Sequence, residues 1–328
     1  MSDANQNNIL PNYCAAIRTL GKSGIYLEVL IRSLKAQTHK PEKIVIYIAE
    51  GYQIPPQVAD EVYIYCKKGM AAQRALPYDE IDTEYILLCD DDIFLPSDSV
   101  EILFKDMMKN GGDCISPNVF PNHTMRLRNK LIHALFYGTF PSVFSKYAFK
   151  IRKSSYYSYK NSPKNIMEAQ SCAGPCMLVK KSVNNSLQYE DEVWMDRFPY
   201  TSGQDQIFAY KLFRYGYKLL IHYSSGVVHL DAQTGHIKDP AKADFNKRMI
   251  RYIEWYRSIY EPNGAFGKFR AVVGYYSYWF WLLMLALLSL AIGRNKYKFK
   301  NSIKALKEGK LYVKSEEFKK IPKWQVKR

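Results

Sequence analysis

The sequence predicts an α/β protein whose central sheet is mostly parallel and is covered by helices on both faces. Short apolar segments rich in β-branched residues alternate with segments whose apolar residues recur at spacings of three and four. Strands that alternate with helices favour parallel pairing, because each helix carries the chain back to the starting edge of the sheet. The hydrophobic fraction, 47% of 328 residues, is ample for the buried core that such a sheet requires.

The N-terminal part supplies most of the strands of this predicted sheet. Strands are expected at residues 13–17, 44–48, 62–65 and 85–89, and helices at 27–34 and 69–76. The first helix is predicted by Leu27, Leu30, Ile31 and Leu34, which lie on one helical face. Ligands of such sheets bind at the carboxyl ends of the strands, so the functional site is expected there.

The second half of the chain continues the pattern with a helix at residues 207–212 and apolar strands at 218–221 and 225–228. The six cysteines have neither the spacing of a zinc site nor that of a disulfide scaffold. They are expected to be small core residues in a reducing compartment.

The formal charge of +16 is concentrated in two segments. Residues 114–167 carry 9 basic and no acidic side chains, and residues 294–328 carry 13 basic and 3 acidic ones. The remainder of the chain has a small excess of acidic side chains. A duplex-binding domain would spread Lys and Arg over one folded face, so the charge pattern argues against nucleic acid as a partner.

The longest apolar segment lies just before the second basic segment. Residues 271–293 form a 23-residue stretch without a charged side chain. As a helix it would be about 35 Å long, enough to cross the core of a bilayer. Its aromatic cluster and basic flanks suit a membrane interface, and a buried core helix is the alternative. Because both flanks are basic, an in-plane, a re-entrant and a single-span helix all stay open.

No signal-peptide pattern precedes the main domain, so we expect it at the cytoplasmic face of the cell membrane. The predicted organisation is a catalytic domain at residues 1–245, including the basic and aromatic segment 114–167. A membrane-associating region at 246–328 would follow, with the apolar helix at 271–293 and a basic tail at 294–328.

Three consecutive carboxylates, Asp90, Asp91 and Asp92, follow the apolar strand 85–89. Because these charges repel one another, a divalent cation such as Mn²⁺ or Mg²⁺ would stabilise them and bridge to a substrate diphosphate. In an extended backbone Asp90 and Asp92 share one side while Asp91 points elsewhere. A solvated acidic loop before the next helix is the alternative.

The ordered set of motifs resembles the inverting family-2 glycosyltransferases with the GT-A fold, of the type that builds bacterial cell-envelope polysaccharides. The resemblance covers roughly residues 12–235. It is carried by the first strand and turn at 13–22 with Thr19, Glu50-Gly51, the segment 69–75 with Arg74, the Asp90–Asp92 DXD motif, the loop and strand 173–178, and the segment 203–208. Two positions depart from the family, because Ala75 replaces an Asn and Gln204 replaces a Glu.

The resemblance implies a role for each matching residue. Asp205 would be the catalytic base, and Gly174 and Gln204 would belong to the acceptor loop. The donor nucleotide would be bound by Thr19, Glu50, Arg74, Asp90 and Asp91, and the divalent cation by Asp92 and His229. His222 is the rival ligand to His229, and a satisfied buried histidine is the ordinary interpretation of either.

Elementary electrostatics is consistent with Asp205 as a base. A carboxylate in the first turn of a helix feels the positive end of the helix dipole, which lowers its pKa, whereas burial and nearby aspartates raise it. Arg74 suits a diphosphate because its guanidinium forms two parallel hydrogen bonds.

The segment 126–160 interleaves basic and aromatic side chains. Such a stretch suits a lipid headgroup region, and we expect an acceptor-side insertion that faces the membrane. A helical hairpin over the sheet and a single-stranded nucleic-acid groove are the alternatives.

The sequence therefore predicts transfer of a sugar from a nucleoside diphosphate, with a UDP-sugar favoured, to a glycan or lipid-linked glycan acceptor at an anionic membrane surface. Residues 246–257 contain no Gln-x-x-Arg-Trp, the mark of processive synthases in this family, so limited addition is expected. A metal-dependent phosphodiester hydrolase and a catalytically decayed nucleotide-sugar-binding module are the alternatives.

Overall fold

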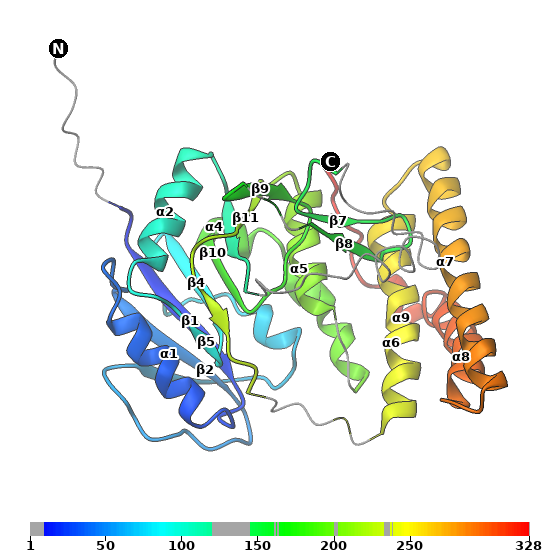
Figure 1. Ribbon diagram of the computed structural model, residues 1–328, viewed down its shortest axis with the longest axis horizontal. Coiled ribbons are helices and arrows are strands. Elements are labelled where there is room, and N and C mark those ends of the chain that lie inside the picture. Colours follow the sequence, from blue (N-terminus) through cyan, green and yellow to red (C-terminus); the bar gives the residue numbers. More distant parts are fainter. Residues whose placement is uncertain are drawn as a thin grey trace, which may run out of the picture.

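A computed structural model describes residues 10–119, 145–160, 162, 164–199, 203–232, 237 and 239–327. Its main sheet consists of β1 (Tyr13–Thr19), β2 (Lys43–Ala49), β3 (Val62–Cys66), β4 (Tyr85–Asp90), β6 (Cys114–Pro117), β9 (Ile166–Ala169), β10 (Cys176–Lys180) and β11 (Leu219–His222). These eight strands lie in the order β3-β2-β1-β4-β10-β6-β11-β9 (Figure 1). The strands expected in the N-terminal part are confirmed.

Most of the sheet is parallel, as predicted. β1 pairs in parallel with β2 and β4, β2 with β3, and β11 with β6. β10 is antiparallel to both β4 and β6, and β9 is antiparallel to β11. β9 and β10 therefore run against the other six strands, and the carboxyl ends of those six point to the same edge of the sheet.

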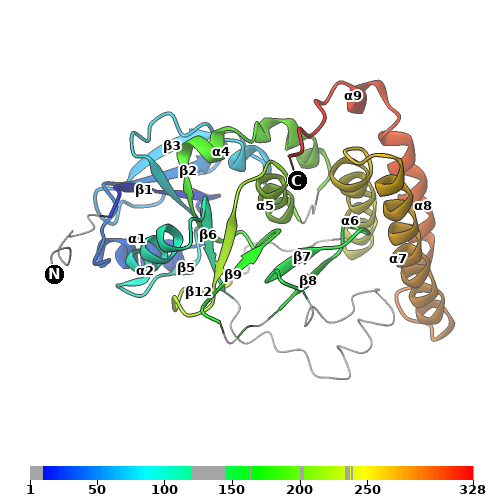
Figure 2. The ribbon, with the colours of Figure 1, turned by 90° about the horizontal axis from the view of Figure 1, so that it is seen from above.

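Helices cover both faces of this sheet (Figure 2). Alternate residues of β1 divide between two hydrophobic cores, with Ile17 in one and Ala16 in the other. The Ile17 core is closed by α1 (Ile25–Lys35) and α2 (Ser99–Lys109). The Ala16 core is closed by α4 (Lys181–Asn185) and α5 (Gln204–Arg214). The helices predicted at 27–34 and 207–212 are thereby confirmed.

The helix predicted at residues 69–76 is not formed. The segment contains one short 3₁₀ turn, η1 (Ala72–Arg74). Asp196 accepts hydrogen bonds from the backbone N–H groups of Ala71 and Ala72, and Pro77 disfavours helical geometry at the residue before it. A capped turn therefore replaces the expected helix.

Two small sheets flank the main one. β5 (Ile93–Phe94) pairs with β12 (Val228–His229), and β7 (Phe149–Ile151) pairs with β8 (Tyr157–Tyr159), both antiparallel. The β7–β8 hairpin is the described part of the basic and aromatic segment, because residues 120–144 lie outside the described residues. The expectation that this segment faces a membrane falls mainly on those residues.

The C-terminal region is helical and forms one end of the molecule (Figure 1). It consists of α6 (Pro240–Trp255), the π-helical turn η4 (Tyr256–Tyr260), α7 (Ala265–Ala291), α8 (Tyr297–Tyr312) and α9 (Glu316–Lys319). The boundary expected between residues 245 and 246 falls inside α6, so it is not a linker. The apolar helix begins six residues earlier than expected, at Ala265, and ends at Ala291.

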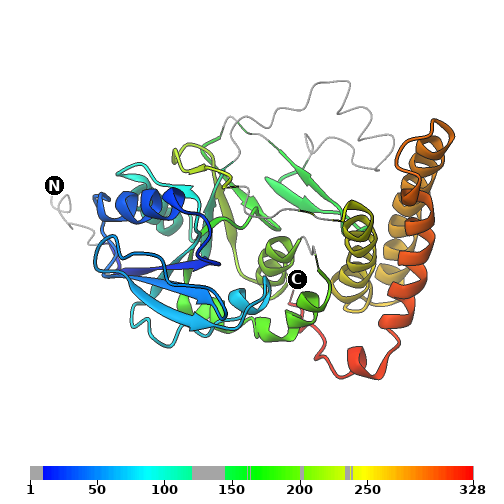
Figure 3. The same ribbon diagram turned by 90° about the horizontal axis from the view of Figure 1, so that it is seen from below.

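The basic tail is not a separate attachment. Beyond α9 the chain returns toward α5 (Figure 3), and Trp324 is buried there. The indole N–H of Trp324 donates to Glu192 at 2.9 Å, and the backbone N–H of Lys327 donates to the Arg214 carbonyl at 2.8 Å. The last residues therefore pack against α5 and the segment that contains Glu192, which the charge count alone does not reveal.

Candidate active site

The candidate site lies where β1, β2 and β4 end side by side. In the register of the sheet Arg18 is opposite Asp90 and Thr19 is opposite Ile48. β4 continues into a turn at Asp91 and Asp92. Because of this turn, each of the three carboxylates contacts a different partner. Asp90 and Asp92 therefore do not share one side, as they would in an extended backbone.

Asp90 is held by two arginines. The Arg18 guanidinium donates to its carboxylate at 2.9 Å, and an Arg74 nitrogen lies 3.7 Å from the same oxygen. Both arginine side chains are nearly buried, while the Asp90 side chain keeps about a third of its surface exposed. Asp90 therefore presents a fixed carboxylate to solvent, as a residue that binds a hydroxyl or a cation must.

Asp91 points back into the protein. It accepts a hydrogen bond from the Thr19 hydroxyl, and that hydroxyl in turn accepts from the backbone N–H of Gly21 at 2.7 Å. Burial raises the pKa of Asp91, and the Thr19 hydrogen bond offsets part of the rise. The predicted residues Thr19 and Asp91 thus meet each other, and together they fix the turn after β1.

Asp92 and His229 form a second group, brought together by the β5–β12 pairing. The His229 Nε2 atom lies 3.1 Å from Asp92 Oδ1, and the Ala232 N–H donates to Asp92 Oδ2 at 3.0 Å. Burial raises the Asp92 pKa, but these two hydrogen bonds outweigh it and the pKa is lowered overall. The hydrogen bond between His229 and Asp92 raises the pKa of His229.

This second group fits a divalent cation in donor type. An aspartate and an imidazole, both partly exposed, leave coordination positions for diphosphate oxygens and water, which is how Mg²⁺ sites at phosphates are commonly completed. Among the described residues, no group of three or more His, Cys, Asp or Glu side chains converges. Asp92 and His229 would thus supply two ligands.

The rival histidine is engaged elsewhere. His222 is buried at the end of β11, where its Nε2 lies 2.8 Å from Asp106 of α2, and its Nδ1 accepts from the Ser224 N–H at 3.2 Å. These contacts give His222 the surroundings of a satisfied core histidine.

Asp205 occupies the first turn of α5, next to Gly174 of the predicted acceptor loop. A Cβ atom added to Gly174 would lie 2.5 Å from the Asp205 Cγ, so the loop can pass this close only because residue 174 has no side chain. The carboxylate forms an ion pair with Arg74, which also approaches Asp90. Arg74 thus links the predicted base to the DXD motif.

The Asp205 carboxyl is electrostatically poised. Burial raises its pKa most and nearby Asp90 raises it further, whereas Arg74 and Arg18 lower it, and the balance is a raised pKa. A raised pKa makes a carboxylate a better proton acceptor, which a general base requires.

The remaining predicted residues lie at the margins of this cluster. Gln204 is buried, its carbonyl accepts from the Tyr189 hydroxyl at 2.7 Å, and its side-chain Oε1 has no hydrogen-bond partner among the described residues. Glu50 is exposed at the end of β2, where its backbone N–H donates to Cys66. Glu50 directly follows β2, the strand next to β1 in the sheet.

One member of the site, Arg18, is missing from the sequence prediction. It also lies 3.5 Å from the Gly174 carbonyl, so it joins β1 to the acceptor loop as well as to Asp90. The signal was present in the sequence, because an arginine interrupts the otherwise uncharged strand 13–19 at the end where ligands bind.

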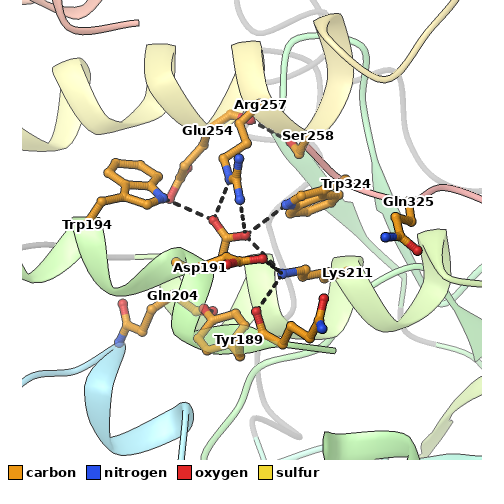
Figure 4. A network of polar contacts seen from close by, with 12 residues as sticks. Tyr189, Asp191, Trp194, Gln204, Lys211, Glu254, Arg257, Ser258, Trp324 and Gln325 are labelled. Atoms are coloured by element: carbon orange, nitrogen blue, oxygen red, sulfur yellow. Dashed lines mark hydrogen bonds and ion pairs between the residues drawn. The ribbon is translucent and has the colours of Figure 1, made fainter. Parts of the chain in front are cut away.

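A buried polar network holds α5 in place through its residue Lys211 (Figure 4). Its centre is Glu192, which accepts from Arg257 at 2.7 and 2.9 Å and from Lys211 at 3.1 Å. The indole groups of Trp194 and Trp324 donate to the same carboxylate. Burial raises the Glu192 pKa, but Arg257 and Lys211 outweigh it and lower the pKa to about 2.

No protein-family model and no curated protein sequence matches the chain. Among solved structures, the mannosyltransferase PcManGT from Pyrobaculum calidifontis in complex with GDP-Man and Mn²⁺ is similar, with a TM-score of 0.51 and 11% identity over 94% of this chain and 89% of that one. GalNAc-T7 with UDP, GalNAc and Mn²⁺ gives 0.50 and 11% over 82% of this chain and 55% of that one, so this chain spans about half its length. These likenesses show that the chain has the GT-A fold of glycosyltransferases.

Proposed function

We propose that the chain is an inverting glycosyltransferase that uses a nucleoside-diphosphate sugar. One observation carries the proposal: the partly exposed Asp205 carboxylate has a raised pKa, and Arg74 links it to the DXD carboxylate Asp90. The proposed base and the proposed donor-binding carboxylate would thus lie on either side of a single guanidinium. The two similar structures, which contain UDP or GDP-Man together with Mn²⁺, support a donor of this class.

The donor would lie across the ends of β1, β2 and β4. Asp90 would orient its ribose, Asp91 and Thr19 would hold the turn beneath it, and Glu50 would contact the base, with uracil favoured. Asp92 and His229 would hold Mn²⁺ or Mg²⁺, which when bound neutralises charge on the departing diphosphate. Arg74 is close enough to exchange its carboxylate partners for diphosphate oxygens, a geometry that suits a guanidinium.

The transfer itself would be one displacement. The acceptor hydroxyl oxygen bonds to the anomeric carbon of the sugar as the bond from that carbon to the diphosphate oxygen breaks, and the electron pair leaves with the nucleoside diphosphate. The hydroxyl proton moves to Asp205, whose exchange of Arg74 for substrate leaves the carboxylate free to accept it. Gly174 and Gln204 would border the acceptor at the start of α5.

The acceptor is proposed to be a lipid-linked glycan at the cytoplasmic face of the membrane, extended by limited addition. α7 is long and apolar enough to span a bilayer: its most apolar 18-residue window has a mean hydropathy of 1.6, and 22% of that window is buried. Large apolar side chains such as Phe266, Phe269 and Phe280 are exposed along it. The next helix along the chain, α8, is rich in lysine, and these lysines would contact anionic headgroups.

The test uses the full-length protein with Mn²⁺ and a panel of nucleotide-sugars. A matching donor should raise the melting temperature, and Asp205→Asn should abolish transfer to a lipid-linked acceptor while keeping that thermal shift. Survival of transfer in Asp205→Asn would refute the base assignment. Donor binding without transfer in the unaltered protein would favour the decayed module, and cleavage of nucleic acid without a nucleotide-sugar would favour the hydrolase.

A further inference from the structure

A cavity of about 220 Å³ lies between α6, α7 and α8, outside the candidate active site. α6 contributes three cations to its wall, Lys247, Arg248 and Arg251, and α7 contributes mostly aromatic and aliphatic side chains. Nothing in the proposed sugar transfer uses this cavity. Its combination of clustered positive charge and apolar surface calls for an amphiphilic, anionic ligand.

The positive charge in the wall is only partly compensated. Arg248 donates to Asp244 at 2.9 Å, and Asp244 is the one carboxylate among the lining residues. Arg251 donates to the Ser155 carbonyl at 2.8 Å, a neutral partner, and lies 3.9 Å from Glu254. Lys247 is exposed and forms no ion pair within the part of the chain that the structure describes. An anion in the cavity would therefore find at least one unpaired cation and one arginine with spare donors.

The apolar part of the wall favours hydrocarbon over a stacked base. The ring of Tyr278 already stacks on Tyr156 at 5.3 Å, and that of Tyr275 lies against Trp255 at 4.5 Å. Trp279, whose indole N–H donates to the Ser302 carbonyl at 3.3 Å, completes the lining together with Ser302, Leu282 and Leu306. A nucleotide would need a free aromatic face, whereas a methylene chain needs only apolar surface.

We propose that this cavity binds the phosphate headgroup of an anionic membrane lipid, with the first part of its hydrocarbon chain against Leu282 and Leu306. The inference rests on the membrane association proposed above for α7, whose outer surface is apolar and exposed. The same helix would then touch the bilayer on one side and a single bound lipid on the other.

The position of the cavity links this lipid to the active site. α6 lies against the segment before α5, because Asn246 donates to the Pro199 carbonyl at 2.8 Å. Near its other end, Glu254 Oε1 lies 3.0 Å from the position that a Cβ on Gly203, the N-cap of α5, would take. A lipid that orders α6 would thereby steady the helix that carries Asp205.

The test measures binding of dihexanoyl phosphatidate, below its micelle concentration, to the full-length protein by calorimetry. Lys247→Glu should weaken this binding by about tenfold or more, because the new carboxylate repels the phosphate and pairs with Arg251 one turn away. Lys247 is exposed, so the variant is expected to fold. The matched control is Lys109→Glu, which makes the same charge change at an exposed lysine of α2, far from α7 and α8, and should leave the affinity unchanged.

Two further ligands test whether both the hydrocarbon chain and the net negative charge of phosphatidate are needed for binding. Inorganic phosphate and dihexanoyl phosphatidylcholine should both bind at least about tenfold more weakly than phosphatidate, because one lacks the chain and the other lacks the net negative charge. Equal binding of phosphate, equal binding of phosphatidylcholine, tighter binding of UDP at this cavity, or an equal effect of Lys109→Glu would each overturn the lipid site.

The thermal shift with a nucleotide-sugar is measured on the same samples. A retained donor shift in Lys247→Glu together with lost lipid binding supports both proposals. If lipid binding fails while the donor shift persists, the lipid site alone is refuted. If the donor shift is absent from the unaltered protein, the proposed transfer is refuted, whatever the lipid result.

Discussion

Arg18 shows how one charged side chain in an apolar strand can organise a site. Strand β1 is buried along its length, so an arginine there is held only where carboxylates and carbonyls receive its donors. It meets Asp90 and the Gly174 carbonyl, two groups from segments more than 70 residues apart in sequence. The residue therefore fixes the distance between the proposed donor and acceptor sides.

Replacing Arg18 by Met should lower the free energy of unfolding by roughly 1–3 kcal/mol. The loss is smaller than for a fully buried pair because Asp90 stays partly solvated and Arg74 remains nearby. Urea unfolding measures the effect. Arg32→Met, which breaks the exposed pair with Glu28, is the control and should change the free energy by no more than about 0.5 kcal/mol. Equal losses in the two variants would contradict the role given to Arg18.

Gly174→Ala should reduce kcat by about a hundredfold while donor binding, read as a thermal shift, is kept. The added methyl group would collide with Asp205, and a displacement of about 1 Å at the base is enough for such a loss. Gly264→Ala is the control, because the structure leaves open space around a Cβ at residue 264. An unimpaired Gly174→Ala enzyme would show that Asp205 has room to move and is not fixed by the loop.

At the scale of elements, sequence pattern located the strands well and the special segments less well. β2 and β4 could be predicted because they are continuous apolar runs, which parallel strands buried on both faces require. The segment 69–76 has helix-forming residues, yet Asp196, more than 120 residues away, caps it as a single turn. No local pattern reports a cap that comes from so far along the chain.

In the candidate site, too, local features were easier to predict than contacts between distant segments. A carboxylate cluster after a buried strand, Asp90–Asp92, is a local feature that the sequence shows, and the family resemblance added Asp205 at the start of a helix; their roles stay predictions. The resemblance assigned Asp92 and His229 to one metal site, but neither the β5–β12 pairing that brings them together nor the position of Arg74 between two carboxylates was predicted. These contacts depend on how distant segments pack.

The exposed apolar surface of α7 predicts that this helix binds to membranes. Phe266 and Phe269 are 73% and 65% exposed at its start, where water gives them no favourable partner. Phe266→Ser should weaken binding to anionic vesicles by about tenfold, since burying one phenylalanine in a bilayer is worth roughly 1.5–3 kcal/mol. Vesicle co-sedimentation measures this.

The control for α7 is Ile25→Ser on α1. Ile25 is also largely exposed but belongs to the opposite end of the molecule (Figure 1). Vesicle binding should be unchanged in that variant. If both variants lose binding equally, the membrane contact is not specific to α7, and if neither does, α7 is covered in solution by something other than lipid.

At the scale of the whole molecule, the last residues of the chain contact the part that carries α5. Glu192, Lys211, Arg257 and Trp324 come from four separate segments and meet at one buried carboxylate. Breaking such a pair leaves buried cations without a counter-charge, which costs about 3–5 kcal/mol. The basic tail thus contributes to folding as well as to the overall charge.

Glu192 also makes stability depend on pH in a defined direction. Its pKa is about 2 in the folded protein against an ordinary value of 4.5, so the unfolded chain binds more protons between these values. The stabilisation is fully present above about pH 4.5 and is lost as pH falls toward 2. The shift corresponds to about 3 kcal/mol, as an order of magnitude.

Glu192→Gln should therefore destabilise the protein at pH 7 by several kcal/mol, and the gap between variant and unaltered protein should narrow as pH falls from about 4.5 toward 2. The glutamine keeps the shape of the side chain but cannot carry the charge that faces Arg257 and Lys211. Urea unfolding across this pH range measures the gap. Glu316→Gln, at an exposed glutamate of α9, should give a difference below about 0.5 kcal/mol. A gap for Glu192→Gln that stays constant across the range would show that the network is held by shape and hydrogen bonds, and that its charge contributes little.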